Sequence, residues 1–142
     1  MKTIRELLKN KGDAVWTIQA DASVFDALKS MAEKEVGALV VLDGRSIVGM
    51  VSERDYARNV ALKGRVSTET PVRDIMTERV VCVRPDQSVD EGMALITDKR
   101  VRHLPVIEND ALVGIVSIGD LVKSTIETQQ FVIEQLENYI SS

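Results

Sequence analysis

The chain has 142 residues, of which 44% are hydrophobic and 28% charged, and its formal net charge is −4. This balance is typical of a globular protein, and the negative charge disfavours a nucleic-acid partner held mainly through its phosphates. No apolar run approaches the roughly 20 residues that a membrane span needs, and the N-terminus lacks the apolar core of a signal peptide. The single cysteine fits a reducing compartment, so we expect a cytoplasmic protein.

The sequence contains two copies of one unit, offset by 65 residues, as from Ser23 to Ser88. A period this long, present twice, indicates a duplicated supersecondary unit. Each copy alone would be marginally stable, so we expect the two to share one core. We divide the chain into a first unit, a linker, a second unit and a C-terminal helix at residues 1–62, 63–70, 71–125 and 126–142.

The first copy predicts the element order β-α-β-β-α after a short helical turn at Thr3–Leu8. A β-rich run at Val15–Ile18 is followed by a helix with polar capping residues and one apolar face. Two strands, Val36–Leu42 and Ile47–Val51, flank an Asp-Gly turn. A second helix begins after Ser52.

The second copy repeats this order. Pro71–Met76 matches the helical turn, and Val80–Val83 matches the first strand. Cys82 lies within that apolar run, so we expect it to be a buried structural thiol. A helix follows, and then the strands Val101–Ile107 and Leu112–Val116.

From Asp120 to Ile140 the sequence is one long helical pattern. Its apolar residues fall near one stripe, which consists of Val122, Ile126, Ile133, Leu136 and Ile140. Two glutamines, Gln129 and Gln130, interrupt this stripe. A stripe beyond the needs of the repeat suggests packing on another subunit. The alternative is that the helix folds back on its own core.

The sharpest motif has a strand, then Gly-x-x-Ser-x-x-Asp, then a helix, and it occurs at Gly49–Asp55 and Gly114–Asp120. A serine hydroxyl and free backbone N–H groups at a helix N-terminus suit a phosphate. An aspartate in the first turn can accept two hydrogen bonds from a ribose diol. The alternative is that each pair only caps its helix, in a variant of the capping box. The duplication favours a function, because many other residue pairs could serve as a cap.

Three short motifs in the second copy, Val72–Thr77, Val101–Val106 and Gly114–Asp120, resemble a CBS domain. The two copies together resemble a CBS pair, or Bateman module, from about Thr3 to Lys123. The resemblance implies an α+β fold with two units packed in pseudo-two-fold symmetry. It also implies clefts that bind adenosine nucleotides such as AMP, ADP, ATP, S-adenosylmethionine or NAD.

The resemblance further implies roles for individual residues. Asp55 and Asp120 would bind ribose hydroxyls, and Ser52 and Ser117 would approach the phosphate. Each cleft would combine the aspartate of one copy with the first strand and loop of the other. The Asp120 cleft would use Thr17, Ile18, Ala22, Val36, Gly37 and Ala38, and the Asp55 cleft would use Val80, Val81 and Cys82. The predicted ligand-binding set also includes Arg54, Arg102, His103 and Gly119.

The cationic members of this set have alternative explanations. Arg102 and His103 become candidates for phosphate contact through the resemblance, but they could also be a surface arginine and a hydrogen-bonded structural histidine. Arg54 belongs either to a solvated helix face or to an anion pocket beside Asp55. The first copy has Gly37 where the second has Arg102, so we expect the two clefts to differ in affinity or ligand.

The sequence thus predicts a nucleotide-sensing regulatory module rather than an enzyme. We expect it to act through a partner protein or a change of oligomer, as a homodimer, with no membrane partner and no catalytic cofactor. One histidine and one cysteine cannot build a structural zinc site, and no P-loop or nucleophile elbow is present. The alternatives are an enzyme that hydrolyses or transfers the bound nucleotide, and a structural dimerisation unit with vestigial clefts.

Overall fold

The computed structural model describes residues 2–12 and 14–141 of the chain. It divides into two compact units, of which unit 1 comprises Met1–Ala14 with Val81–Ser142, and unit 2 comprises Val15–Val80. The N-terminal segment therefore packs with the second sequence repeat, and the segment that precedes the second repeat packs with the first. The division predicted at residues 62, 70 and 125 follows from the sequence repeat and stays a prediction. The two units of the structure are defined by which segments pack together.

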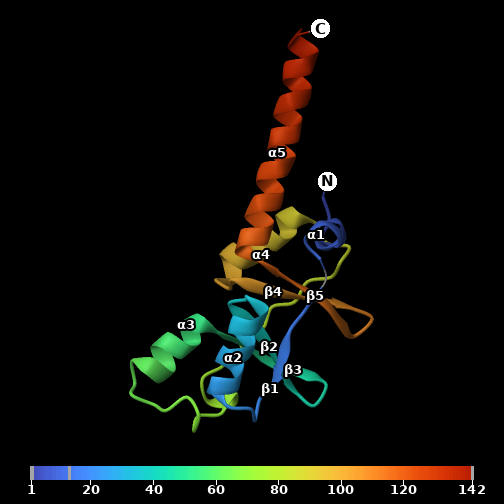
Figure 1. Cartoon of the computed structure of the whole chain (residues 1–142). Coiled ribbons are helices and arrows are strands. Elements are labelled where there is room, and N and C mark those ends of the chain that lie inside the picture. The colour runs from blue at the N-terminus through green and yellow to red at the C-terminus, as the bar shows by residue number, and fades with distance from the viewer. Residues whose placement is uncertain (1, 13, 142) are drawn as a thin grey trace. The chain divides into compact units, whose positions relative to one another are not determined.

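Unit 2 is built on a three-stranded sheet in the order β1-β2-β3, with one helix packed against it (Figure 1). β1 runs parallel to β2, and β2 and β3 form an antiparallel hairpin with a bulge after Val41. The strands are β1 (Thr17–Gln19), β2 (Ala38–Asp43) and β3 (Ser46–Ser52). The helical segments are α2 (Val24–Lys34), α3 (Glu53–Tyr56), the π-helical η1 (Ala57–Ala61) and the 3₁₀-helical η2 (Val72–Asp74).

The crossover from β1 to β2 is made by α2, whose ends are set by local chemistry. The Ser23 hydroxyl accepts a hydrogen bond from the Asp26 N–H at 3.0 Å, which satisfies a free donor of the first turn. The helix ends at Glu35, which adopts a left-handed conformation with φ of 55°. Its buried face meets the sheet in one core: Val24, Ala27, Met31, Leu39, Val41, Val51, Val60, Val72 and Ile75.

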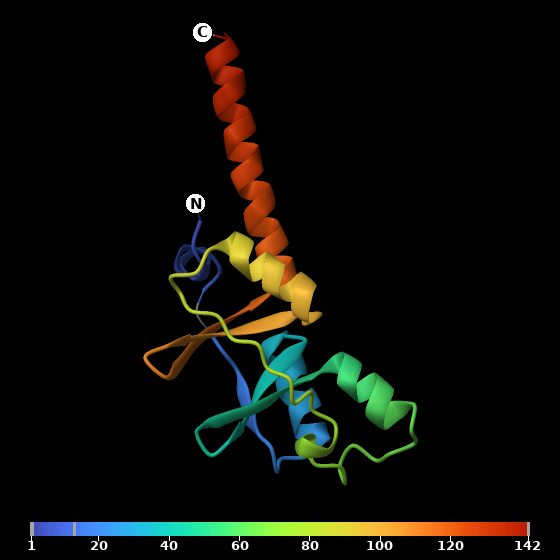
Figure 2. The same cartoon turned by 180° about the vertical axis from the view of Figure 1, so that it is seen from behind.

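Unit 1 has an antiparallel hairpin, β4-β5, covered by helices (Figure 2). Its elements are α1 (Ile4–Lys11), α4 (Val89–Lys99), β4 (His103–Glu108), β5 (Ala111–Ser117) and α5 (Ile118–Ser141). The first residues of α5 pack beside α4, and both contact the core that α1 closes. That core consists of Ile4, Leu7, Leu8, Val83, Val89, Ile96, Leu104, Val106, Val116 and Leu121.

The strand predicted at Val80–Val83 is wrong, because only Val83 forms a bridge, to Val106. The matching position in unit 2 shows the reason. There the Val40 N–H donates to the Trp16 carbonyl at 3.2 Å and supports β1. Pro105 replaces Val40 in the second repeat and has no N–H, so this part of the ladder cannot form.

The prediction that Cys82 is buried is also wrong, because its side chain is exposed. Consecutive residues of an extended chain point to opposite sides, and the neighbouring Val83 is the buried one. Partial desolvation raises the pKa of the Cys82 thiol, which keeps it in the less reactive protonated form at neutral pH.

The long C-terminal helical pattern is confirmed as α5, a single helix of 24 residues. Every residue from 126 to 141 is exposed, so the alternative in which this helix folds back on its own core is wrong. Figure 1 shows its C-terminal half running on past α4 within unit 1. Among the described residues, no helix is long and apolar enough to cross a membrane.

Candidate functional site

In unit 2 the Ser52–Asp55 motif forms a reciprocal cap where β3 passes into α3. Ser52 is still extended, with φ of −133° and ψ of 166°. Its hydroxyl accepts from the Asp55 N–H at 3.2 Å, while Asp55 Oδ2 accepts from the Ser52 N–H at 2.9 Å. The other carboxylate oxygen, Oδ1, accepts from the Thr77 hydroxyl at 3.2 Å. The carboxylate is thus fixed at the first turn by donors on two sides.

In unit 1 the Ser117–Asp120 motif repeats the cap with a different third partner. The Asp120 N–H donates to the Ser117 hydroxyl at 3.1 Å, and Asp120 Oδ2 accepts from the Ser117 N–H at 2.8 Å. Lys11 Nζ lies 2.7 Å from the same Oδ2 and also donates to the Ile115 carbonyl at 2.5 Å. Outside its own motif, the Asp120 carboxylate is thus partnered by an ammonium group, whereas the Asp55 carboxylate is partnered by the Thr77 hydroxyl.

The ionisation of Asp120 reflects these contacts. Partial burial by itself would raise the pKa of this carboxyl. The hydrogen bond and charge of Lys11, with the hydrogen bonds from Ser117, outweigh that effect and hold the pKa below its usual value. Asp120 is an anion at neutral pH.

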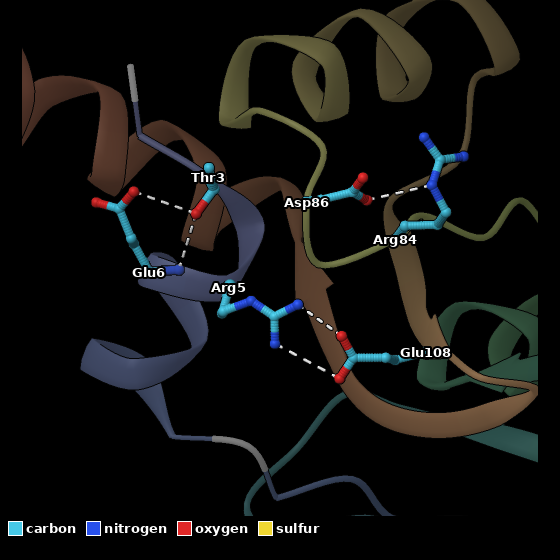
Figure 3. Close-up of polar contacts among 6 residues, drawn as sticks. All are labelled: Thr3, Arg5, Glu6, Arg84, Asp86 and Glu108. Carbon is cyan, nitrogen blue, oxygen red and sulfur yellow. Dashed lines mark hydrogen bonds and ion pairs between the residues drawn. The ribbon is translucent and has the colours of Figure 1, made fainter.

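Lys11 reaches Asp120 because α1 is anchored on unit 1 at its other end. The Thr3 hydroxyl caps α1 by accepting from the Glu6 N–H at 3.2 Å. The Arg5 guanidinium faces the Glu108 carboxylate at the end of β4, with Nη2 and Oε2 2.5 Å apart (Figure 3). Sequence reasoning missed Lys11 and Thr77, because each belongs to a segment that precedes its own repeat and packs on the other.

The cap alone does not distinguish the two motifs from the rest of the chain. α2 begins with Ser23 and Asp26, and α4 begins with Ser88 and Glu91, whose N–H donates to the Ser88 hydroxyl at 3.0 Å. Ser-x-x-acid capping is therefore a general device in this protein. The two motif sites have a second hydrogen bond as well, in which the aspartate carboxylate accepts from the serine N–H.

Two pairs of predicted site residues lie directly beside the motif of their own repeat. Ala38 is paired with Ser52 across the β2–β3 ladder, and the Gly37 carbonyl accepts from the Glu53 N–H at 3.1 Å. In the same way, His103 is paired with Ser117, and the Arg102 carbonyl accepts from the Ile118 N–H at 2.9 Å. The assignment of Gly37 and Ala38 to the Asp120 cleft stays a prediction.

His103 is largely shielded from water, and this burial lowers the pKa of its imidazole. The charges of Lys11 and Arg102 lower it further, and that of Asp120 opposes them. The ring is therefore neutral at pH 7, when it can donate or accept one hydrogen bond but carries no charge toward a phosphate.

The other predicted site residues are distributed over both units. Thr17 and Ile18 lie in β1, opposite Val40 and Val41, and the Ala22 carbonyl accepts from the Val72 N–H at 2.8 Å. Val36 and Val80 are partly buried in unit 2, and Val81 is partly buried in unit 1. Arg54 and Gly119 are exposed in the first turns of α3 and α5.

A cavity of about 430 Å³ lies within unit 1 beside Asp120. Its lining residues are Lys2, Leu7, Asn10, Lys11, Asp120, Lys123, Ser124 and Glu127. Lys2 faces Glu127 at 3.9 Å, so two of its three lysines already have carboxylate partners. In the described part of the chain, no group of three or more His, Cys, Asp or Glu side chains could hold a metal ion.

The family model of the CBS domain matches residues 4–62 and 72–127, which together make up most of the chain. The protein belongs to the CBS domain family. The two matches follow the two repeats, so the chain is a tandem CBS pair with an additional C-terminal helix.

Relatives and solved structures agree with this assignment. The mitochondrial CBS domain-containing protein CBSX3 of Arabidopsis thaliana is 40% identical over 147 residues, covering 97% of this chain and 71% of that protein. A signal-transduction protein with CBS domains from Burkholderia ambifaria has a TM-score of 0.84 at 50% identity, covering 90% of this chain and 96% of that one. The hexameric CBS-CP12 protein of bloom-forming cyanobacteria has a TM-score of 0.77 at 31% identity, covering 86% and 70% of the two chains.

Proposed function

We propose that this CBS pair is a regulatory module that senses an adenosine nucleotide and signals through a partner protein or a change of assembly. The observation that carries the proposal is the duplicated motif. In each unit a serine hydroxyl, a helix N-terminus and a first-turn carboxylate lie together where a strand ends. A phosphate suits the N-terminal donors, and a carboxylate suits a ribose diol.

The family supports a regulatory role more strongly than a catalytic one. CBS pairs are generally regulatory modules for adenosine-containing ligands, and the relative from Burkholderia ambifaria is described as a signal-transduction protein. AMP, ADP, ATP, NAD and S-adenosylmethionine all carry the ribose and adenine that the proposal needs. The single cysteine supports a reducing compartment, which we propose to be the cytoplasm.

The direct test is binding of a nucleotide panel, measured by thermal shift and calorimetry. We expect micromolar affinity, about −7 to −8 kcal/mol. A ligand at about 100 times its dissociation constant stabilises the native state by roughly 2.7 kcal/mol. No shift with any member of the panel at millimolar concentration would contradict the proposal, and product formation during incubation would favour an enzyme instead.

The same experiment on variants tests whether the motifs form the sites. Asp55→Ala and Asp120→Ala should each weaken one class of site by about 1–3 kcal/mol, because each removes a charged acceptor. Asp26→Ala is the positional control, since Asp26 stands three residues after the N-cap serine of α2 but lies outside both motifs. We expect the two sites to differ, because Lys11 neutralises only Asp120. Equal losses of nucleotide affinity in all three variants would mean that the two motifs only cap their helices and do not form the binding sites.

We also propose that the module is a homodimer. The helices that begin at the two motifs, α3 and the start of α5, would pack across a two-fold axis, and the C-terminal half of α5 would add to that interface. Oligomers occur among solved relatives, since the cyanobacterial CBS-CP12 protein is hexameric. Light scattering at tens of micromolar tests this proposal, and a monomer would contradict it.

A further inference from the structure

The C-terminal half of α5 carries apolar side chains that nothing in unit 1 covers. The start of the helix is anchored through Leu121 and Ser124, which are 0% and 3% exposed. Beyond residue 125 the exposure rises sharply, to 59% for Ile126, 47% for Ile133 and 56% for Leu136. A run of large apolar residues in water is unfavourable unless another surface covers it.

The exposed residues occupy a different face of α5 from its anchor. At 3.6 residues per turn, the stripe from Ile126 to Ile140 is centred about 130° around the helix from the Leu121–Ser124 face. Figure 2 shows α5 continuing as one helix beyond α4. The stripe therefore cannot rest on the core of unit 1 while the helix stays continuous.

The spacing of the stripe is that of a coiled coil. Ile126, Ile133 and Ile140 recur every seven residues, and Gln129 and Leu136 follow the first two by three. These spacings define the a and d positions of a heptad repeat. Val132 and Tyr139 occupy the flanking g positions, whereas Phe131 lies at f, outside the seam.

The charges on this segment indicate which surface covers the stripe. The charged residues from 126 to 141 are Glu127, Glu134 and Glu137, and none stands at an a or d position. A helix that lies on a membrane surface usually carries Lys or Arg on its polar face, and this segment has neither. Glu137, at e, would face the uncharged Val132 at g of a parallel partner. Two copies can therefore pair without bringing like charges together.

The identity of the seam residues also selects the arrangement of the two helices. Among parallel coiled coils, isoleucine at a with leucine at d favours two strands. In a parallel pair Gln129 would face its own copy, and the two amides could hydrogen-bond. In an antiparallel pair, in which a packs against d, Gln129 would face Ile133 or Ile140 and its buried amide would lack a partner.

We propose that residues 126–140 of α5 pair with the same segment of a second copy as a parallel, in-register, two-stranded coiled coil. The partner is this chain itself, and the paired glutamines at position 129 set the register. This inference rests on the proposed homodimer and gives it a specific interface. It is independent of nucleotide binding, so the two can fail separately.

Disulfide trapping in the full chain tests the pairing. In a Cys82→Ser background, Gln129→Cys and Leu136→Cys should each give mostly disulfide-linked dimer under mild oxidation. In a parallel, in-register pair, each a or d residue lies close to the same residue of the second chain, within the reach of a disulfide. Glu134→Cys, at b and outside the seam, is the matched control and should stay largely monomeric on a non-reducing gel. Equal crosslinking at 134 and 129, or none at 129 and 136, would overturn the proposal.

A second substitution checks that trapping reports the seam. Ile133→Asp, added to Gln129→Cys, should reduce the rate of crosslinking at least ~10-fold, because it places a charge in the apolar seam. Gln135→Asp, at c, should leave the rate unchanged. Nucleotide thermal shifts should match those of the parent in both variants, which separates loss of the coil from loss of fold. The same crosslinking rate with Ile133→Asp as with Gln135→Asp would contradict the coil.

Discussion

Gly49 and Gly114 occupy the same place in the two repeats, yet alanine should have different effects at the two sites. A Cβ at Gly49 would lie 2.9 Å from the carbonyl oxygen of Thr77 and 2.8 Å from Sδ of Met76. A Cβ at Gly114 would lie 3.0 Å from both methyl carbons of Leu8. One glycine thus faces backbone and the other faces the end of a side chain.

The change in the free energy of unfolding depends on how easily the group that meets the new Cβ can move. The Thr77 carbonyl accepts a hydrogen bond from the Met50 N–H at 2.9 Å, and the Thr77 N–H donates to the Met50 carbonyl at 2.8 Å. These two bonds hold the Thr77 backbone in place. Overpacking against such a group costs about 1–3 kcal/mol. Leu8 borders a cavity of about 450 Å³ in unit 1, so it can shift at a rotamer cost of about 0.5–1.5 kcal/mol.

Alanine also stabilises both variants by about 0.4–1 kcal/mol, because it restricts the unfolded chain. We therefore expect Gly49→Ala to lower the free energy of unfolding by about 1–2 kcal/mol and Gly114→Ala to change it by less than about 1 kcal/mol. Urea unfolding, followed by circular dichroism and by Trp16 fluorescence, measures both. The displaced Thr77 should also weaken ligand binding at Asp55. A Gly114→Ala variant at least as destabilised as Gly49→Ala would refute the reasoning.

Two further predictions concern single positions in unit 1. Burial lowers the pKa of His103 in the folded state, so the unfolded chain takes up a proton at this histidine at a higher pH than the folded chain does. The contribution of neutral His103 to the free energy of unfolding is therefore complete above about pH 6.5 and is lost as the pH falls. His103→Gln should therefore flatten the fall in urea stability between about pH 7 and 5, and an unchanged slope would contradict this cause. Pro105→Val should restore the N–H that the ladder lacks and pair it with the Val81 carbonyl; hydrogen exchange no slower at 105 than at an exposed loop amide would contradict the explanation.

The local parts of the fold and of the candidate site could be predicted from the sequence. Periodicity and turn residues predicted α2, α4 and the two hairpins, because these depend on contacts within a few residues. The capping bonds of Ser52 with Asp55 and of Ser117 with Asp120 span three residues, so spacing alone predicted them. The 65-residue offset indicated a duplicated unit, and the resemblance of three short motifs in the second copy indicated the family.

Contacts between distant segments were decided only by the tertiary structure. Val80–Val83 has a strand-like sequence, but Pro105, more than 20 residues later, removes the donor that the strand would need. Lys11 reaches Asp120 because α1 packs on the second repeat, and the sequence spacing gives no sign of this. Such contacts depend on which surfaces meet after the chain folds, whereas helix periodicity and caps depend on neighbours that the chain itself supplies. The same distinction applies to α5, since its heptads are visible in the sequence but its uncovered face is visible only in the folded unit.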